Sequence, residues 1–184
     1  MLIDRWLRNI RKKTNLRNVA HQIYFTTVSQ SRKPTLFSDL EVPDTLDGRF
    51  DLVILHISLV LRRLRSSGES GKQLSDALFT VMFDDLDQTI REMGVGDIRV
   101  GKKVKAMARA FYGRCLAYDS ALDSNDNEAL EKALCKNIYG LNTVTSPKSG
   151  ILSHYVKDVV IKLDTQKDQD LLEGRIKFPQ IDLN

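Results

Sequence analysis

Cysteine is scarce in this sequence, and its scarcity excludes two classes of small protein. The 184 residues contain two cysteines, Cys115 and Cys135, which form no C-x-x-C pair and follow no secretory leader. A disulfide framework or a zinc-binding spacing is therefore not indicated, whereas a reducing compartment is. We expect both thiols to pack as small apolar side chains.

Histidine is equally sparse. His21, His56 and His154 stand far apart, with no recognisable serine-histidine-acid or cysteine-histidine arrangement around them. His56 lies among apolar residues and is expected to be a hydrogen-bonded core histidine. The sequence thus predicts no enzyme, no metal and no cofactor. A hydrolase or metal enzyme is an alternative that metal in the purified protein would support.

Glycine patterns that bind phosphate or dinucleotides are missing as well. Gly71-Lys72 invites comparison with a Walker A loop, but Ser66 stands where that motif requires its first glycine. Gly94-x-Gly96 has Arg99 at the third glycine position of a dinucleotide fingerprint and lies in no βαβ unit. We expect a loop over 66–71 and a turn between two helices at 93–97.

What the sequence does contain is the periodicity of a helical globular domain. Its residues are 42% hydrophobic and 28% charged, and its length suffices for one sizeable core. Apolar residues at i, i+3, i+4 and i+7 predict helices over 17–30, 44–65, 72–93, 98–119, 127–137 and 155–163, with a short continuation at 168–172. We expect an all-α, single-domain bundle of about six to eight helices over 17–184, preceded by a basic arm over 1–16.

The stretch 41–64 is expected to form an apolar central helix near 45–65. Pro43 keeps Val42 out of the helical region, so the helix begins just after it. Asp44 is the expected N-cap and Asp47 the expected capping-box acid. Asp47 or Arg49 is also expected to join a buried ion pair at the helix start. Three bases suit the negative end of the helix dipole: Arg62, Arg63 and Arg65.

Charge is spread unevenly along the chain. The formal net charge is +4, yet residues 1–36 carry eight lysines and arginines and a single acid, Asp4. No run of the arm approaches the roughly 20 apolar residues of a membrane-spanning helix. The arm is an interfacial anchor, part of an organellar presequence or a frayed, solvated terminus. Its basic excess favours an anionic partner such as lipid headgroups or nucleic acid.

Two neighbouring predicted helices carry opposite charge. The first has an acidic face: Asp84, Asp85 and Asp87. The second has six bases and no acid between residues 98 and 118: Arg99, Lys102, Lys103, Lys105, Arg109 and Arg114. The helices can pair these charges across a hairpin, present separate surfaces to partners or simply be solvated. Paired carboxylates can bind metal, but no histidine lies nearby, so a solvated or partner-facing acidic surface is the better interpretation.

Two long runs resemble the ubiquinol-cytochrome c chaperone family. They are VPDTLDGRFDLVILHISLVLRRL at 42–64 and ALFTVMFDDLDQTIREMGVGDIRVGKKVKAMARAFYGR at 77–114, and the likeness extends from about Val19 to Phe178-Pro179. The resemblance implies a helical, non-enzymatic assembly factor for cytochrome b of the bc1 complex, ubiquinol-cytochrome c reductase. Members act in mitochondria near the ribosomal exit with a small partner protein. This chain looks like the shorter bacterial form, without a long targeting leader.

Expected partners and location follow from that resemblance. Cytochrome b is the implied client, and a small partner protein, the ribosome or an anionic membrane surface are further partners. We expect the six bases to face a membrane or partner and the three acids to form a second protein-binding surface. The expected location is the cytoplasm, peripheral to the inner face of the cytoplasmic membrane, or the mitochondrial matrix for a eukaryotic source. The chief alternative is a nucleic-acid- or ribosome-binding helical protein that uses the same basic helix, although no recognition-helix signature supports it and no specific nucleic acid is expected.

Overall fold

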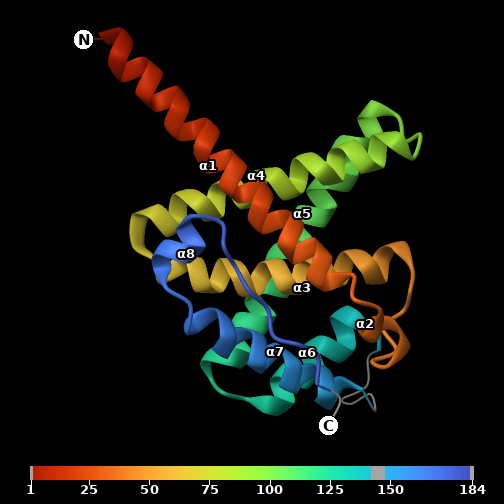
Figure 1. The fold of residues 1–184 in the computed structure, drawn as a ribbon. Coiled ribbons are helices and arrows are strands. Elements are labelled where there is room, and N and C mark those ends of the chain that lie inside the picture. Colours follow the sequence, from red (N-terminus) through yellow and green to blue (C-terminus); the bar gives the residue numbers. More distant parts are fainter. Residues whose placement is uncertain (1, 142–147, 183–184) are drawn as a thin grey trace.

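The computed structural model describes the backbone of residues 2–141 and 148–182, and the side chains within those ranges from residue 14 onward apart from residue 98. These residues form eight α-helices and no strand, which confirms the all-α prediction (Figure 1). In chain order the helices are α1 (Leu2–Ser31), α2 (Pro34–Ser38), α3 (Leu46–Arg65), α4 (Gly68–Glu92), α5 (Asp97–Asp123), α6 (Asn127–Ile138), α7 (Ser149–Asp164) and α8 (Asp168–Leu172).

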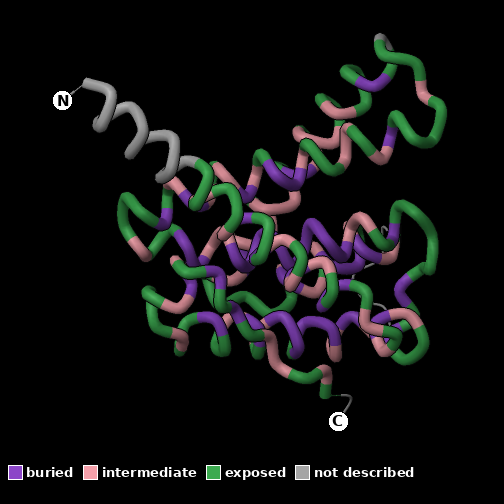
Figure 2. The backbone as a smooth tube through the Cα atoms, turned by 45° about the horizontal axis from the view of Figure 1, so that its top comes forward, coloured by how far each residue is buried: buried purple, intermediate pink, exposed green. Residues whose placement is uncertain are grey.

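Helix α3 is the centre of the fold, as its apolar run predicts. It contacts α1, α4, α5, α6 and α7 (Figure 1). Twelve of its 20 residues are buried, including an unbroken run from Leu52 to Val60. Each fully buried leucine or isoleucine contributes about 1.5 to 3 kcal/mol relative to an exposed one, so this helix supplies much of the apolar driving force. Figure 2 shows that buried residues gather where the helices meet in the body.

The start of α3 differs from the prediction in its cap and its ion pair. Thr45 is the N-cap, and its Oγ1 accepts a hydrogen bond from the Gly48 N–H at 3.1 Å. The Asp44 carboxylate instead pairs with Arg49 at 2.5 Å, and both side chains are more than half exposed, so the predicted buried ion pair of Asp47 or Arg49 is wrong. Gly48 is required here, because a Cβ on it would lie 2.1 Å from the Pro43 carbonyl oxygen.

Several helix boundaries also differ. Helix α1 is continuous from Leu2, so the backbone of the arm belongs to the same helix as residues 17–30. Gly68 adopts φ +63°, which lets the chain turn sharply, and α4 therefore begins at residue 68 where a loop to residue 71 is predicted. Helix α5 runs on to Asp123, and a short helix that the apolar periodicity does not predict, α2, begins at Pro34, whose fixed φ suits the first turn of a helix.

His56 is the hydrogen-bonded core histidine that its apolar surroundings predict. Its Nδ1 lies 2.8 Å from the Leu52 carbonyl oxygen, which can only accept, so Nδ1 carries the proton. Its Nε2 therefore accepts from the Tyr155 hydroxyl at 2.8 Å, and the Gln30 side-chain amide donates to the same hydroxyl at 2.7 Å. Burial lowers the pKa of His56 to about 4, so the ring is neutral near pH 7. The two cysteines are free, with Cys135 buried and Cys115 half-buried, as expected of packing residues.

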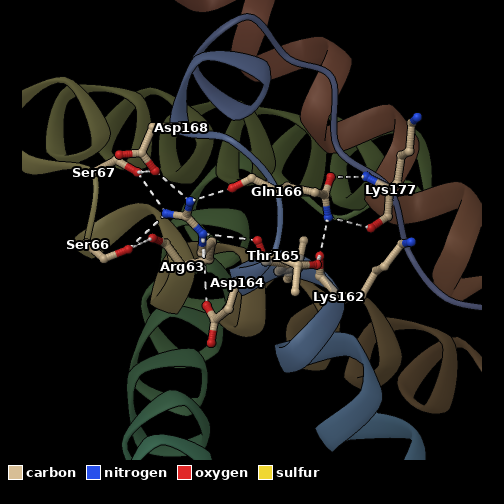
Figure 3. Close-up of polar contacts among 10 residues, drawn as sticks. Arg63, Ser66, Ser67, Lys162, Asp164, Thr165, Gln166, Asp168 and Lys177 are labelled. Atoms are coloured by element: carbon tan, nitrogen blue, oxygen red, sulfur yellow. Dashed lines mark hydrogen bonds and ion pairs between the residues drawn. The ribbon is translucent and has the colours of Figure 1, made fainter.

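Arg63 joins the end of α3 to two other parts of the chain (Figure 3). Its side chain is only 8% exposed. Its Nε donates to the Leu163 carbonyl at 3.0 Å, and Nη2 donates to the Gln166 carbonyl at 2.9 Å and to Asp168 at 2.5 Å. Nη1 donates to the hydroxyls of Ser66 and Ser67 at 2.9 and 3.0 Å. Arg63 thus does more than end its own helix, because it connects α3 to the start of α4 and to the α7–α8 segment.

Replacing Arg63 by alanine is expected to lower the free energy of unfolding by about 2 to 4 kcal/mol, because the carbonyls of Leu163 and Gln166 lose the charged donor that satisfies them. Urea unfolding followed by circular dichroism measures the change. Arg49→Ala is the matched control: it removes an exposed ion pair and should cost no more than about 1 kcal/mol. Equal effects of the two substitutions would contradict the structural role of Arg63.

Candidate protein-binding surface

Helices α4 and α5 form an antiparallel hairpin whose far end projects beyond the body of the molecule (Figure 1). Aromatic rings hold the two helices together at its base: Phe79, Phe83, Phe111 and Tyr112, with ring centroids 4.4 to 6.1 Å apart. Gly94, at φ +79°, forms the turn. The far end is mostly exposed (Figure 2), so it offers side chains that the fold itself does not use.

Five of the six predicted bases lie exposed along α5: Arg99, Lys102, Lys103, Lys105 and Arg109. None of them forms an ion pair with any residue whose side chain the structure describes. Arg114 differs, because its half-buried guanidinium pairs with Asp51 of α3 at 2.8 Å. We call the five exposed bases the basic patch. Like charges this close repel one another unless an anionic partner neutralises them.

The three predicted acids already have partners within the chain. Asp84 pairs with Arg17 of α1 at 3.0 Å, and Asp85 accepts a hydrogen bond from the Tyr24 hydroxyl at 2.8 Å. Burial and this hydrogen bond raise the pKa of Tyr24. Two of the acids therefore hold α1 against α4, and they do not pair with the bases of α5.

The third acid pairs close to the turn of the hairpin. Asp87 accepts from Arg91 of its own helix at 2.5 Å, and Arg91 also pairs with Asp97 of α5. The Arg91–Asp97 contact crosses the hairpin, but Arg91 belongs to α4 and Asp97 to α5, so the pair does not involve the bases of α5. The basic patch gains no neutralisation from it.

A groove of about 540 Å³ lies between the projecting half of the hairpin and the body, where the start of α3, the second half of α4, α5 and the end of α6 line it. Its apolar lining is Leu46, Phe50, Leu86, Ile90, Met93 and Met107. Leu46 is 58% exposed and Met93 is 55% exposed, so the groove leaves apolar surface in contact with solvent. The groove was not predicted from the sequence, because four helices contribute to it. The apolar periodicity of one helix carries no information on how separate helices pack together.

The Asp51–Arg114 ion pair lies in the wall of this groove, together with Asp47, Lys103 and Lys136. Burial raises the pKa of the Asp51 carboxyl to about 6, even though Arg114 pulls it down, and the nearby charge of Asp47 raises it further. The groove thus combines an apolar floor with a few charged groups, which suits an apolar polypeptide segment that has polar or charged neighbours.

Other kinds of site were sought in the described residues. No group of three or more histidine, cysteine, aspartate and glutamate side chains comes together there. None of the described helices is long and apolar enough to cross a membrane.

The arrangement of helices matches that of a solved protein, the Cbp3 homolog from Brucella abortus. The two structures superpose with a TM-score of 0.84 and 34% sequence identity, over 96% of this chain and 98% of that one. The fold therefore places this chain in the class of all-α Cbp3 homologues.

Sequence comparison identifies the family. The profile described as Ubiquinol-cytochrome C chaperone matches residues 38–178, and this chain belongs to that family. Relatives named ubiquinol-cytochrome c reductase complex assembly factor 1 are 26% identical over 174 residues in Mus musculus and 28% identical over 160 residues in Xenopus laevis. The aligned region covers 59% of the mouse protein and 80% of the frog protein. The resemblance stated from the two long runs is confirmed.

The raised pKa of Asp51 predicts a pH dependence of stability. Between about pH 4 and pH 6 the folded state keeps a proton that the unfolded chain, with an ordinary carboxyl pKa of 3.8, has released. The free energy of unfolding should therefore fall as the pH rises through this interval and level off above it. We expect about 1 to 2 kcal/mol, since the carboxyl keeps some contact with solvent.

Urea unfolding of Asp51→Asn at several pH values checks this prediction. The variant should lack that part of the pH dependence, whereas Asp76→Asn, at an exposed position, should follow the wild-type curve. Parallel curves for wild type and Asp51→Asn would show that the carboxyl titrates normally.

Proposed function

We propose that this protein is a non-enzymatic assembly chaperone that binds newly made cytochrome b and assists assembly of ubiquinol-cytochrome c reductase. The family and the names of the relatives support assembly of that complex. The observation that carries the proposal is the open apolar groove beside the unpaired basic patch. A membrane subunit without its partners exposes apolar helices joined by charged loops, and a surface of this composition can hold both.

The groove would shield an apolar segment of the client. Burial of apolar surface contributes about 25 cal/mol per Å², so a segment that covers Leu46 and Met93 gains affinity without any chemical step. The groove is open, so it can release the segment once other subunits cover it. Lys103 belongs to both the groove lining and the basic patch, so the two surfaces are contiguous and one client can contact both.

The basic patch would contact an anionic surface, either membrane lipid or the ribosome. Each lysine near an anionic membrane contributes about 1 kcal/mol, and the five bases lie on one rigid helix. This contact would keep the protein in the cytoplasm, peripheral to the inner face of the membrane, or in the matrix in a mitochondrial setting. A second binding role for Asp84 and Asp85 requires a partner that competes with Arg17 and Tyr24. The Arg17–Asp84 pair is exposed and therefore weak enough to be exchanged.

Cross-linking in cells followed by identification of the captured protein tests the function. Wild type should recover cytochrome b. Lys102→Glu/Lys103→Glu/Lys105→Glu should recover much less of it and should bind anionic vesicles about a hundredfold more weakly, because three favourable charges become repulsive. Helicity should persist, since all three positions are exposed and glutamate is a good helix former.

The matched control is Lys72→Glu/Lys162→Glu/Lys167→Glu, which changes net charge equally at exposed lysines that belong neither to the groove nor to the basic patch. It should behave as wild type. Absence of cytochrome b from the wild-type captures would refute the client assignment. Strong RNA binding that falls steeply with salt would instead favour the nucleic-acid-binding alternative, which the same patch can support.

A further inference from the structure

A second depression, the α5–α6 trench, lies between these two helices and continues the groove. Its volume is about 540 Å³, and it shares Ala110, Arg114, Lys136 and Asn137 with the groove. Small residues line it from both sides: Ala110, Gly113 and Ala117 of α5, and Ala129 and Ala133 of α6. Spacings of three and four residues place each set on one face of its helix, so the trench is shallow because its side chains are short.

Gly113 has no structural reason to be glycine. It lies in the interior of the 27-residue helix α5, and a Cβ on it would meet nothing within 4 Å. Its φ is not positive, so its backbone conformation suits any residue. Glycine at such a position destabilises a helix relative to alanine, because it loses more backbone freedom on folding. The missing side chain leaves the floor of the trench open, which allows a second backbone to approach closely.

The charges around the trench have one sign. Arg114, Lys132 and Lys136 line it, and no acid does. Lys132 and Lys136 are four residues apart on α6, so they repel each other. Asp51, which lines the groove, pairs with Arg114. Among the described side chains, no ion pair joins Asp51 to Lys132 or Lys136. An occupant that carries carboxylates would neutralise these lysines.

We propose that the α5–α6 trench binds one α-helix of a partner protein, which packs through small apolar residues and carries carboxylates along the edge that faces Lys132 and Lys136. A helix fits because a trench floored by Ala110, Gly113 and Ala117 accepts the ridge of another helix at close range. The surrounding helices offer no strand edge to an extended peptide. This inference goes beyond the proposed function, because it does not require that the helix belong to cytochrome b.

Two labelled helical peptides of about 20 residues, a length that sustains helicity, test the proposal by fluorescence anisotropy with the full chain. One carries alanines on one face and glutamates along the adjacent edge, and the other has glutamine in place of glutamate. The acidic peptide should bind wild type at least about tenfold more tightly than the glutamine peptide, because only its carboxylates can form charge-assisted hydrogen bonds with the two lysines.

Two variants should each weaken binding of the acidic peptide about tenfold or more. Gly113→Leu fills the trench, and Lys132→Glu/Lys136→Glu reverses its charge. Gly101→Leu is the matched control for the first, since Gly101 is another glycine in the interior of α5 whose Cβ would meet nothing, but it lies outside the trench. Lys72→Glu/Lys162→Glu is the control for the second. Both controls should bind as wild type, and thermal unfolding should show that all four variants fold.

Several outcomes would overturn the proposal. One is failure of wild type to bind the acidic peptide, and another is equal binding of the two peptides. Unchanged binding by Gly113→Leu excludes packing in the trench, and the charge-reversed variant supplies an independent answer if Gly113→Leu does not fold. If phosphatidylglycerol vesicles lose binding to Lys132→Glu/Lys136→Glu while the acidic peptide does not, the lysines serve a lipid surface and the helix proposal fails.

Discussion

The guanidinium of Arg63 holds together segments that lie about a hundred residues apart in the chain. A buried cation is tolerated only when its donors are satisfied, and here two carbonyls, two hydroxyls and one carboxylate satisfy them. Since the hydroxyls belong to the residues just before α4, the end of α3 and the start of α4 cannot move independently. Arg63 therefore helps, together with the turn at Gly68, to fix the direction in which α4 leaves α3.

The direction of α4 in turn creates the binding surfaces. Helix α4 packs beside α1 and α3 as far as Asp84 and Asp85, whereas its last turns continue with α5 beyond the body (Figure 1). Apolar side chains in that second half, such as Leu86 and Met93, then have too few neighbours to be buried completely and line the groove. In this geometry no acid of α3 forms an ion pair with the basic patch among the described side chains, although Lys103 lines the groove together with Asp47 and Asp51. A hairpin that lay flat on the body would bury these groups or neutralise them.

Apolar periodicity predicts most of this fold because burial along a helix is a local pattern, as the agreement between the predicted 127–137 and the observed α6 shows. Ion-pair partners are not local. Arg114 looks like the other bases of its helix, yet Asp51 of α3 lies opposite it, and Asp84 meets Arg17 of α1. At the start of α3 two neighbouring residues could each serve as the cap, and the nearby Arg49 decides between them by engaging Asp44. The groove forms only where four helices pack together, so no local sequence pattern predicts it.

Two glycines show the same limit of prediction from sequence, and one of them bears on the function of the trench. In the sequence, Gly48 and Gly113 are alike as single glycines within predicted helices. The structure separates them, because the Pro43 carbonyl excludes a side chain at Gly48 and nothing excludes one at Gly113. The fold thus explains why residue 48 is a glycine. Gly113 destabilises its helix, and no close contact in the structure compensates for this. Gly101 is as free of contacts as Gly113, so the place of Gly113 on the floor of an open, positively charged depression, and not its being a glycine, points to an occupant. The trench therefore belongs with the basic patch and the groove, as a surface completed by another molecule.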